Sequence, residues 1–292
     1  MSFGLNSINF SKYTYYGEGL NNASVYSEYS GITDGDASFG LENWLTTSGY
    51  GTNFKLGVIY TPISEVRLGL AFHTPTYWTL TDECFSAINY EMSNYNDNKK
   101  YIGVEESNAG YYDEVKYKIN TPWKVNASVA TVLGGKAVIS FEYERVAYDD
   151  MKIEYRNGFG AYKEDKIVSK SIKDYYKGMD IYRVGAEYRL TQNISLRAGY
   201  AYESSPMTED AFNNNVEIIT AGTMPSYTFD KSTQYFTGGL GFKAGGFYAD
   251  LAYVYKLRQS EYHAFSSYAD IDKKAFNKFE LYEYVVVLLT SI

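Results

Sequence analysis

Apolar and polar residues alternate with a period of two along much of this chain. In residues 54–60, for example, Phe54, Leu56, Val58 and Tyr60 are separated by single residues. The same alternation covers six further segments, at residues 66–73, 123–130, 139–144, 182–190, 194–202 and 247–256. Because successive side chains of a β-strand point to opposite faces of a sheet, each segment predicts a strand with one apolar face and one polar or small face.

Three weaker segments are also predicted to be strands, namely residues 2–12, 233–243 and 278–290, which brings the predicted total to ten strands. The chain contains no run of apolar residues long enough for a transmembrane helix. No stretch has the composition of a linker between domains. The pattern therefore predicts an all-β chain that forms one domain over residues 1–292.

The connections between the predicted strands alternate between short and long. The short ones have turn-forming sequences and lie at residues 61–64, 133–136, 191–193 and 243–246. The long ones are polar and lie at roughly 13–50, 80–111, 157–177, 204–231 and 260–276. This alternation is typical of antiparallel up-and-down transmembrane barrels, in which short periplasmic turns alternate with longer external loops.

Charged residues of both signs occupy mid-strand positions on the polar face. The cations are Arg67, Lys124, Arg183, Arg189 and Arg197, and the acidic residues are Glu142, Glu144, Glu187 and Asp250. In a soluble antiparallel sheet this face would lie in water, and the apolar face would be buried. In a barrel these residues must face the lumen, because Arg or Lys on the lipid side near the midplane costs ~2–4 kcal/mol.

The composition narrows the class of protein further. Tyrosine accounts for 33 of the 292 residues, and its half-polar ring suits the boundary between lipid and water. The net charge of -8 argues against a nucleic-acid partner. A single cysteine, Cys84, excludes a disulfide within the chain and a cysteine-based metal site.

Several segments resemble the FadL/TodX family of outer-membrane transporters for long-chain fatty acids and aromatic hydrocarbons. The resemblance covers about residues 50–260 and is carried by the segments 53–62, 66–75, 121–125, 182–190 and 196–200. It implies a fourteen-stranded barrel with an N-terminal hatch, whereas the chain offers ten predicted strands and no Asn-Pro-Ala hatch motif. It also lacks a signal-peptide pattern and a C-terminal aromatic residue. We therefore expect a barrel domain that lacks its N-terminal part.

Enzymatic chemistry finds little support in the sequence. The two histidines, His73 and His263, lie far apart, and no Gly-x-Ser-x-Gly motif is present. Acidic pairs such as Asp149–Asp150, Glu105–Glu106 and Asp270 with Asp272 are interpreted as solvated loop charge rather than calcium ligands. We expect no catalytic residues, no metal and no cofactor.

The first functional hypothesis is passive uptake of hydrophobic compounds, with long-chain fatty acids favoured, through the outer membrane of a Gram-negative bacterium. One or two of the five listed cations would bind the carboxylate of such a ligand. Equally, the same cations could form an ion-pair network with the four acidic residues. Alternatives are a non-transporting structural or adhesive barrel that acts through its loops, and an outer-membrane lipid-modifying enzyme. The expected partners are a hydrophobic small molecule and membrane lipid, and the protein is expected to be a monomer.

Overall fold

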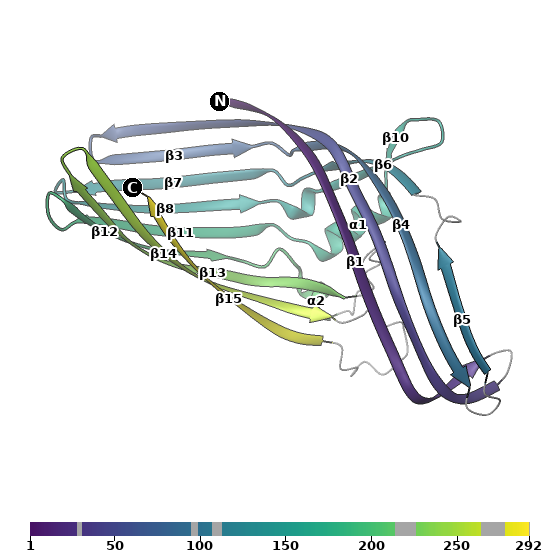
Figure 1. The fold of residues 1–292 in the computed structure, drawn as a ribbon. Helices are drawn as coiled ribbons and strands as arrows, with labels where there is room; N and C mark the ends of the chain where they lie inside the picture. Colours follow the sequence, from purple (N-terminus) through teal and green to yellow (C-terminus); the bar gives the residue numbers. More distant parts are fainter. Residues whose placement is uncertain (28–30, 95–98, 107–112, 214–225, 264–277, 292) are drawn as a thin grey trace.

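The computed structural model describes residues 1–27, 31–94, 99–106, 113–213, 226–263 and 278–291, and in them the chain forms one large antiparallel sheet (Figure 1). The strands are β1 (Ser2–Ser27), β2 (Gly31–Ile63), β3 (Val66–His73), β4 (Tyr77–Asn94), β5 (Lys99–Glu106), β6 (Asp113–Asn120), β7 (Lys124–Leu133), β8 (Ala137–Val146), β9 (Lys152–Arg156), β10 (Tyr162–Glu164), β11 (Met179–Arg189), β12 (Ile194–Glu203), β13 (Tyr227–Ala244), β14 (Phe247–His263) and β15 (Lys278–Ser291). The predicted all-β antiparallel architecture is confirmed.

The pairings arrange these strands as a meander. β2 pairs with β3 along one part of its length and with β4 along another. β3 and β4 therefore lie end to end along the same edge of β2. In the same way, β7 and β6 follow each other beside them, and β8 and β9 come next. Then follow β11, β12, β13, β14 and β15, each paired with its neighbour. All ten predicted strands lie within this meander.

Two neighbouring strand lines are interrupted at the same level, each at a Thr-Pro pair. Pro75 separates β3 from β4, and Pro122 separates β6 from β7. Proline cannot donate to a backbone ladder, so it breaks the regular pairing. The threonines replace part of it, because the Phe54 amide donates to Thr74 Oγ1 at 3.0 Å and the Thr76 amide donates to Thr121 Oγ1 at 2.8 Å.

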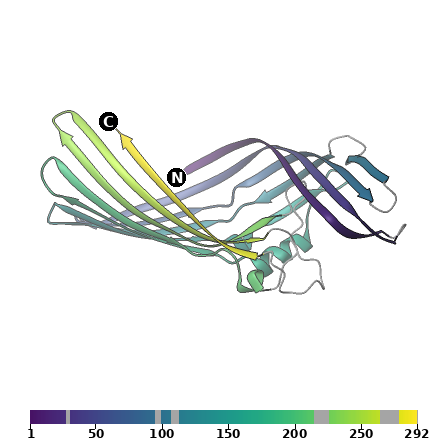
Figure 2. The same ribbon diagram turned by 60° about the horizontal axis from the view of Figure 1, so that its bottom comes forward.

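The interruptions divide the sheet into two parts with different directions. We call the strands β3, β7, β8 and β11–β15, with the end of β2, the wall; Figure 1 shows them running side by side toward the short turns. We call β1, β4, β5, β6 and residues 31–52 of β2 the projecting sheet, which bends away from the wall. Among the described residues β15 pairs with β14 alone, and Figure 2 shows it apart from β1. The sheet in the described residues is therefore curved and open.

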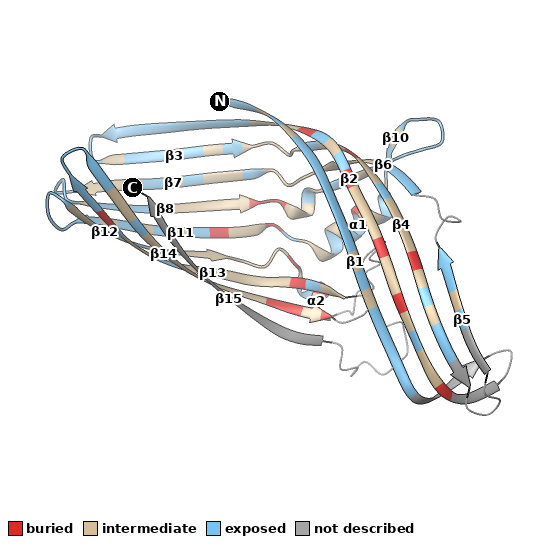
Figure 3. Cartoon of the chain, in the orientation of Figure 1, coloured by how far each residue is buried: buried red, intermediate tan, exposed pale blue. Residues whose placement is uncertain are grey.

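The apolar face of the wall is exposed. Figure 3 shows few buried positions along these strands. Exposed fractions reach 55% for Leu70, 49% for Val184 and 45% for Leu240. No second layer of the described chain covers these side chains, whereas a soluble sheet would bury them. The arrangement fits a face that meets lipid.

The four predicted short turns are present at the far end of the wall. The turn after β7 contains Gly134 and Gly135 with φ of 55° and 63°, a conformation that two-residue hairpin turns of the mirror-image type require. The first turn lies slightly later than predicted, because β2 continues through Thr61 and Pro62 with a register shift between Tyr60 and Ile63. Pro62 is tolerated at such an irregularity.

The prediction of long polar loops was wrong for residues 13–50 and 80–111. Their described parts belong to β1, β2, β4 and β5, whose backbones pair continuously. Polar residues occupy positions on both faces of these strands, so no apolar alternation marks them. The predicted loop 260–276 lies mostly outside the described residues, although β14 extends to His263.

Short helices close the end of the wall that is opposite to the turns. They are η2 (Tyr148–Asp150), α1 (Lys166–Tyr175) and α2 (Glu209–Asn213). Asp165 begins α1, since its side chain accepts from the amides of Ile167 and Val168. Met207, Ala211 of α2 and Phe229 form a small buried cluster. No helix in the described residues is both long and apolar enough to span a membrane.

Candidate functional site

The wall has a second face, opposite to the exposed apolar one, that carries the predicted site residues. We call it the charged face. Strand register places Glu142 opposite Arg183, and Glu187 opposite Arg197. Asn126 lies opposite Glu144, and Gly241 lies opposite Asp250. The period-two alternation thus brings residues from six strands onto one surface.

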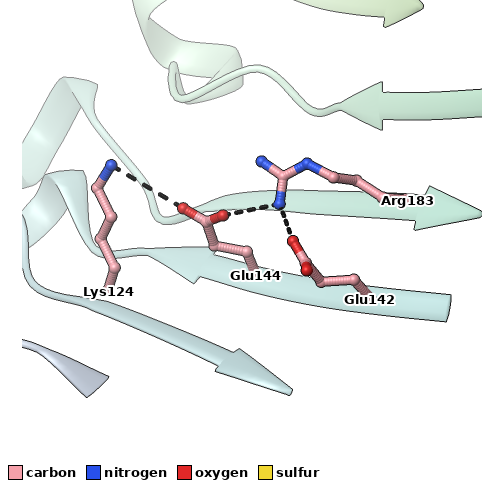
Figure 4. Close-up of polar contacts among 4 residues, drawn as sticks. All are labelled: Lys124, Glu142, Glu144 and Arg183. Carbon is pink, nitrogen blue, oxygen red and sulfur yellow. Dashed lines mark hydrogen bonds and ion pairs between the residues drawn. The ribbon is translucent and has the colours of Figure 1, made fainter. Parts of the chain in front are cut away.

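The first ion-pair cluster centres on Arg183 of β11 (Figure 4). Its guanidinium donates to Glu142 and, at 2.8 Å, to Glu144 of β8. Lys124 Nζ lies 3.9 Å from the other oxygen of Glu144. Two cations and two carboxylates therefore balance each other across β7, β8 and β11.

The second cluster centres on Arg197 of β12. Its Nε donates to Glu187 of β11 at 2.8 Å, and another guanidinium nitrogen donates to Asp250 of β14 at 2.6 Å. The Tyr248 hydroxyl also donates to Asp250. The arginine reaches across the strand between because Gly241 and Gly239 of β13 carry no side chain in its path, and it joins three strands in this way.

Between the two clusters the charged face is hollowed. An open hollow of about 820 Å³ has small residues along its floor, namely Ser128, Ala130, Ser140, Gly185, Gly199, Ala201, Thr237, Gly239 and Ala252. Gly185 and Gly199 lie directly opposite each other. A side chain at either position would crowd its neighbours, since an added Cβ at Gly199 would lie 2.7 Å from Thr237 Oγ1. We call this feature the central hollow.

The central hollow was not among the features predicted from the sequence. The alternation indicated only the charged residues of the polar face. The signal was present in the alternation itself, because Gly185, Gly199 and Gly239 fall at polar-face positions of adjacent strands. Only strand register shows that these positions align into one row.

Arg67 and Arg189 stand apart from the two clusters. Arg67 of β3 lies opposite Ala130, at the side of the central hollow. Arg189 lies at the turn end of β11 and lines a separate, smaller hollow. Among the described residues neither arginine forms an ion pair, in contrast to Lys124, Arg183 and Arg197.

The remaining residues noted in the sequence lie elsewhere. His73 ends β3 at the level of the strand interruptions, opposite Lys55 and Lys124. His263 is buried with Glu261, 2.9 Å between Nε2 and Oε1, and stacks on Tyr227. Asp270 and Asp272 lie outside the described residues. Within the described part of the chain no group of three or more His, Cys, Asp or Glu residues is placed to hold a metal ion.

The aromatic residues near the short helices are partly enclosed. Tyr148 of η2 stacks on Tyr176, which follows α1, with 6.4 Å between ring centroids. Burial raises the pKa of both hydroxyls above the usual tyrosine range. These rings remain neutral at physiological pH and pack as apolar groups beside the end of the charged face.

The family model for outer membrane protein transport proteins (OMPP1/FadL/TodX) matches residues 31–222. The chain belongs to this family. No curated protein sequence matches the chain. The match includes β2 to β12 and therefore both halves of the first ion-pair cluster.

Three solved structures are similar to the chain at low sequence identity. A FadL homologue of Pseudomonas aeruginosa has 8% identity and a TM-score of 0.40, with 89% of this chain and 82% of that chain covered. The P. putida toluene transporter TodX has 10% identity and a TM-score of 0.31, with 87% and 82% covered. The Ralstonia pickettii toluene transporter TbuX has 11% identity and a TM-score of 0.32, with 97% and 68% covered.

Family membership decides the broad function. The chain is a transport protein of the Gram-negative outer membrane that moves hydrophobic compounds. It is a transport channel and not an enzyme, which agrees with the sequence-based expectation. The lipid-modifying alternative is therefore rejected.

Proposed function

We propose that this protein carries long-chain fatty acids passively across the outer membrane along the charged face of the wall. The observation that supports this most is the central hollow, a row of glycine and other small residues between two ion-pair clusters. Small side chains leave room for an alkyl chain, and neighbouring apolar atoms of Val138 and Ala252 offer it contacts. Proteins of this type keep the lipid-facing side apolar and the interior polar, as the two faces of this wall require.

The cations of the two clusters have a bracing role in this proposal. Arg183 and Arg197 each donate to two carboxylates, so their charges are already matched. A fatty-acid carboxylate would have to displace an acidic side chain to bind either one. We therefore assign Lys124, Arg183 and Arg197, with Glu142, Glu144, Glu187 and Asp250, to holding neighbouring strands in register and to bordering the path. Arg67 and Arg189 remain the candidate ligand-binding cations.

In a cell we propose that the protein acts as a monomer surrounded by outer-membrane lipid. Residues 1–292 would form a single outer-membrane β-barrel domain.

The alternative is a structural or adhesive barrel that acts through its external part. The observation in its favour is a row of aromatic rings across the projecting sheet. Tyr13, Trp44 and Phe85 lie on three adjacent strands with ring centroids 5.1 Å apart at both steps. Tyr13 is 54% exposed, so this row presents aromatic surface to solvent.

Uptake of a labelled fatty acid by cells that depend on this gene separates the two functions. Ala252→Trp places a bulky ring in the central hollow, and Ala249→Trp places the same ring on the apolar face of the same strand. We expect the first variant to lower the uptake rate at least about tenfold, since a blocked hollow excludes the ligand, and the second to leave it near wild type.

Heat-dependent mobility on gels and surface labelling would show that both variants assemble. Equal uptake by the two variants would contradict the proposed path. Uptake that is unchanged when the whole gene is deleted would contradict transport itself and favour the adhesive alternative.

A further inference from the structure

A second hollow lies at the turn end of the charged face. It has a volume of about 320 Å³ and is formed by the ends of β11 and β13, the starts of β12 and β14 and the turn between β11 and β12. Arg189, Lys243, Ser195 and Asn193 are among the residues that line it. We call it the turn-end hollow. In the transmembrane arrangement of the family the short turns face the periplasm, so this hollow lies where a ligand leaves the wall.

The turn-end hollow carries an excess of positive charge. Arg189 follows Glu187 by two positions and Lys243 follows Gly241 by two, so both belong to the charged face. Within the described residues neither Arg189 nor Lys243 forms an ion pair. Glu187 also lines the hollow, but Arg197 already binds its carboxylate at 2.8 Å. Two cations therefore remain unmatched in one small space.

The backbone around the two cations is fixed on both sides. The Lys243 amide donates to the Asn193 carbonyl at 2.8 Å, and Asn193 Nδ2 donates to the Lys243 carbonyl at 2.6 Å. The Arg189 amide donates to the carbonyl of Lys136 in the neighbouring turn at 2.7 Å. These bonds hold the strand ends in place. They use backbone groups of Arg189 and Lys243, so neither cationic side chain takes part in them.

The chemistry of the lining fits a carboxylate. A guanidinium offers paired N–H donors in the spacing of two carboxylate oxygens, and an ammonium adds charge without a fixed direction. The Ser195 hydroxyl is a further donor in the same lining. Because the short turns lie near the periplasmic head groups of the membrane, a phospholipid phosphate is another source of the same negative charge.

The turn-end hollow adjoins the central hollow. Glu187 and Arg197 line both of them. Arg189 lies four positions from Gly185, which corresponds to roughly 13 Å along a strand. An amphiphile with its head group at Arg189 can therefore lay its chain along the small residues near Gly185 and Gly199. A neutral hydrocarbon would gain nothing from the cations.

We propose that the turn-end hollow is an exit site for the carboxylate of a long-chain fatty acid, bound by Arg189 and Lys243. This rests on the proposed function, because it needs a fatty acid in the central hollow. The site favours anionic amphiphiles over their neutral counterparts, and it holds the head group at the periplasmic end before release.

The test uses the full chain in detergent with pyrene-labelled palmitate and its methyl ester as probes. The double variant Arg189→Gln with Lys243→Gln keeps polar side chains at both positions and removes both charges. We expect its Kd for the acid to rise about tenfold and its Kd for the ester to stay within about twofold, since charge-assisted hydrogen bonds to the ligand are lost. The variant Lys163→Gln with Lys166→Gln, far from the charged face, is the matched control and should bind both probes as wild type does.

Each outcome decides the proposal. Equal weakening for acid and ester, or no weakening for the acid, overturns the exit site while the proposed function stands, as long as the wild type binds both probes. Failure of the wild type to bind either probe overturns both. Displacement of the acid from the wild type by phosphatidylglycerol, but not by excess unlabelled palmitate, would assign the hollow to membrane phospholipid and overturn the fatty-acid assignment.

Discussion

The wall and the projecting sheet have the same antiparallel pairing and share β2, yet their sequences differ in kind. In the wall, Val58, Leu70 and Val184 are exposed on one face, while the other face holds ion pairs and glycines. In the projecting sheet, polar residues such as Asn43 and Glu42 lie beside Trp44 without a consistent apolar face. Backbone pairing alone holds a sheet together in both regions. The period-two pattern therefore indicates that the two faces of the wall have different surroundings. A strand whose two faces have similar surroundings, as in the projecting sheet, does not show this pattern.

A charge on the apolar face should separate the two regions most strongly. We expect Val184→Arg to lower the free energy of unfolding in bilayers by ~2–4 kcal/mol, because the arginine must enter lipid. Leu20→Arg, at a position in β1 that is 60% exposed, should change it by less than ~0.5 kcal/mol. Urea titrations of the folded protein in lipid vesicles measure both. Similar costs for the two variants would mean that the apolar face does not meet lipid.

Removing the central aromatic ring of the projecting sheet tests whether that region is stabilised independently. We expect Trp44→Ala to destabilise the projecting sheet locally by ~2 kcal/mol, since ring contacts with Tyr13 and Phe85 contribute about 0.5–1.5 kcal/mol each. Hydrogen exchange of the β1, β2 and β4 amides should increase, while exchange in β11 and β12 stays unchanged. An increase of equal size in β11 would show that the two regions unfold as one unit.

Breaking the first ion-pair cluster should affect the wall alone. We expect Arg183→Met to destabilise it by roughly 1–2 kcal/mol, because Glu142 and Glu144 then lie together without their main partner. The figure is modest because the groups are partly exposed to solvent. Adding Glu142→Gln should restore part of the loss. Lys170→Met, which breaks the surface pair with Asp174 in α1, serves as the control and should leave the free energy of unfolding nearly unchanged.

The junction between the regions depends on threonine hydroxyls. We expect Thr121→Val to cost about 1 kcal/mol, because the Thr76 amide loses its acceptor where Pro75 and Pro122 interrupt the ladder. The exchange rate of the Thr76 amide proton, followed by NMR, reports this directly. Should the rate remain at its wild-type value, the interruption is held by other contacts.

Much of the wall could be predicted from sequence because its two faces differ. Residues 182–190 and 194–202 carry the alternation clearly, and the structure has strands at these positions with the predicted short turn between them. The resemblance to the FadL/TodX family is likewise confirmed by the family match. The projecting sheet could not be found in this way, because β1 beyond residue 12 and β4 have polar residues on both faces.

The candidate site could be predicted only in part. The sequence identified Arg183, Arg197 and their acidic neighbours as residues of one face, but the pairing of each arginine with two carboxylates depends on register. The central hollow depends on it even more, because it arises from glycines on separate strands that are aligned across the sheet. Arg183 and Arg197 form ion pairs and Arg189 does not, among the described residues, and this difference can be seen only in the structure.

The most direct test of the account is the environment of two positions on β14. Nitroxide labels attached through Ala249→Cys and Ala252→Cys, each in a Cys84→Ser background, report lipid and water access by their collisions with oxygen and a water-soluble nickel complex. The account predicts that the label at 249 meets lipid, that the label at 252 meets water, and that palmitate slows the motion of the label at 252 alone. Equal environments at the two positions, or no effect of palmitate at 252, would contradict it.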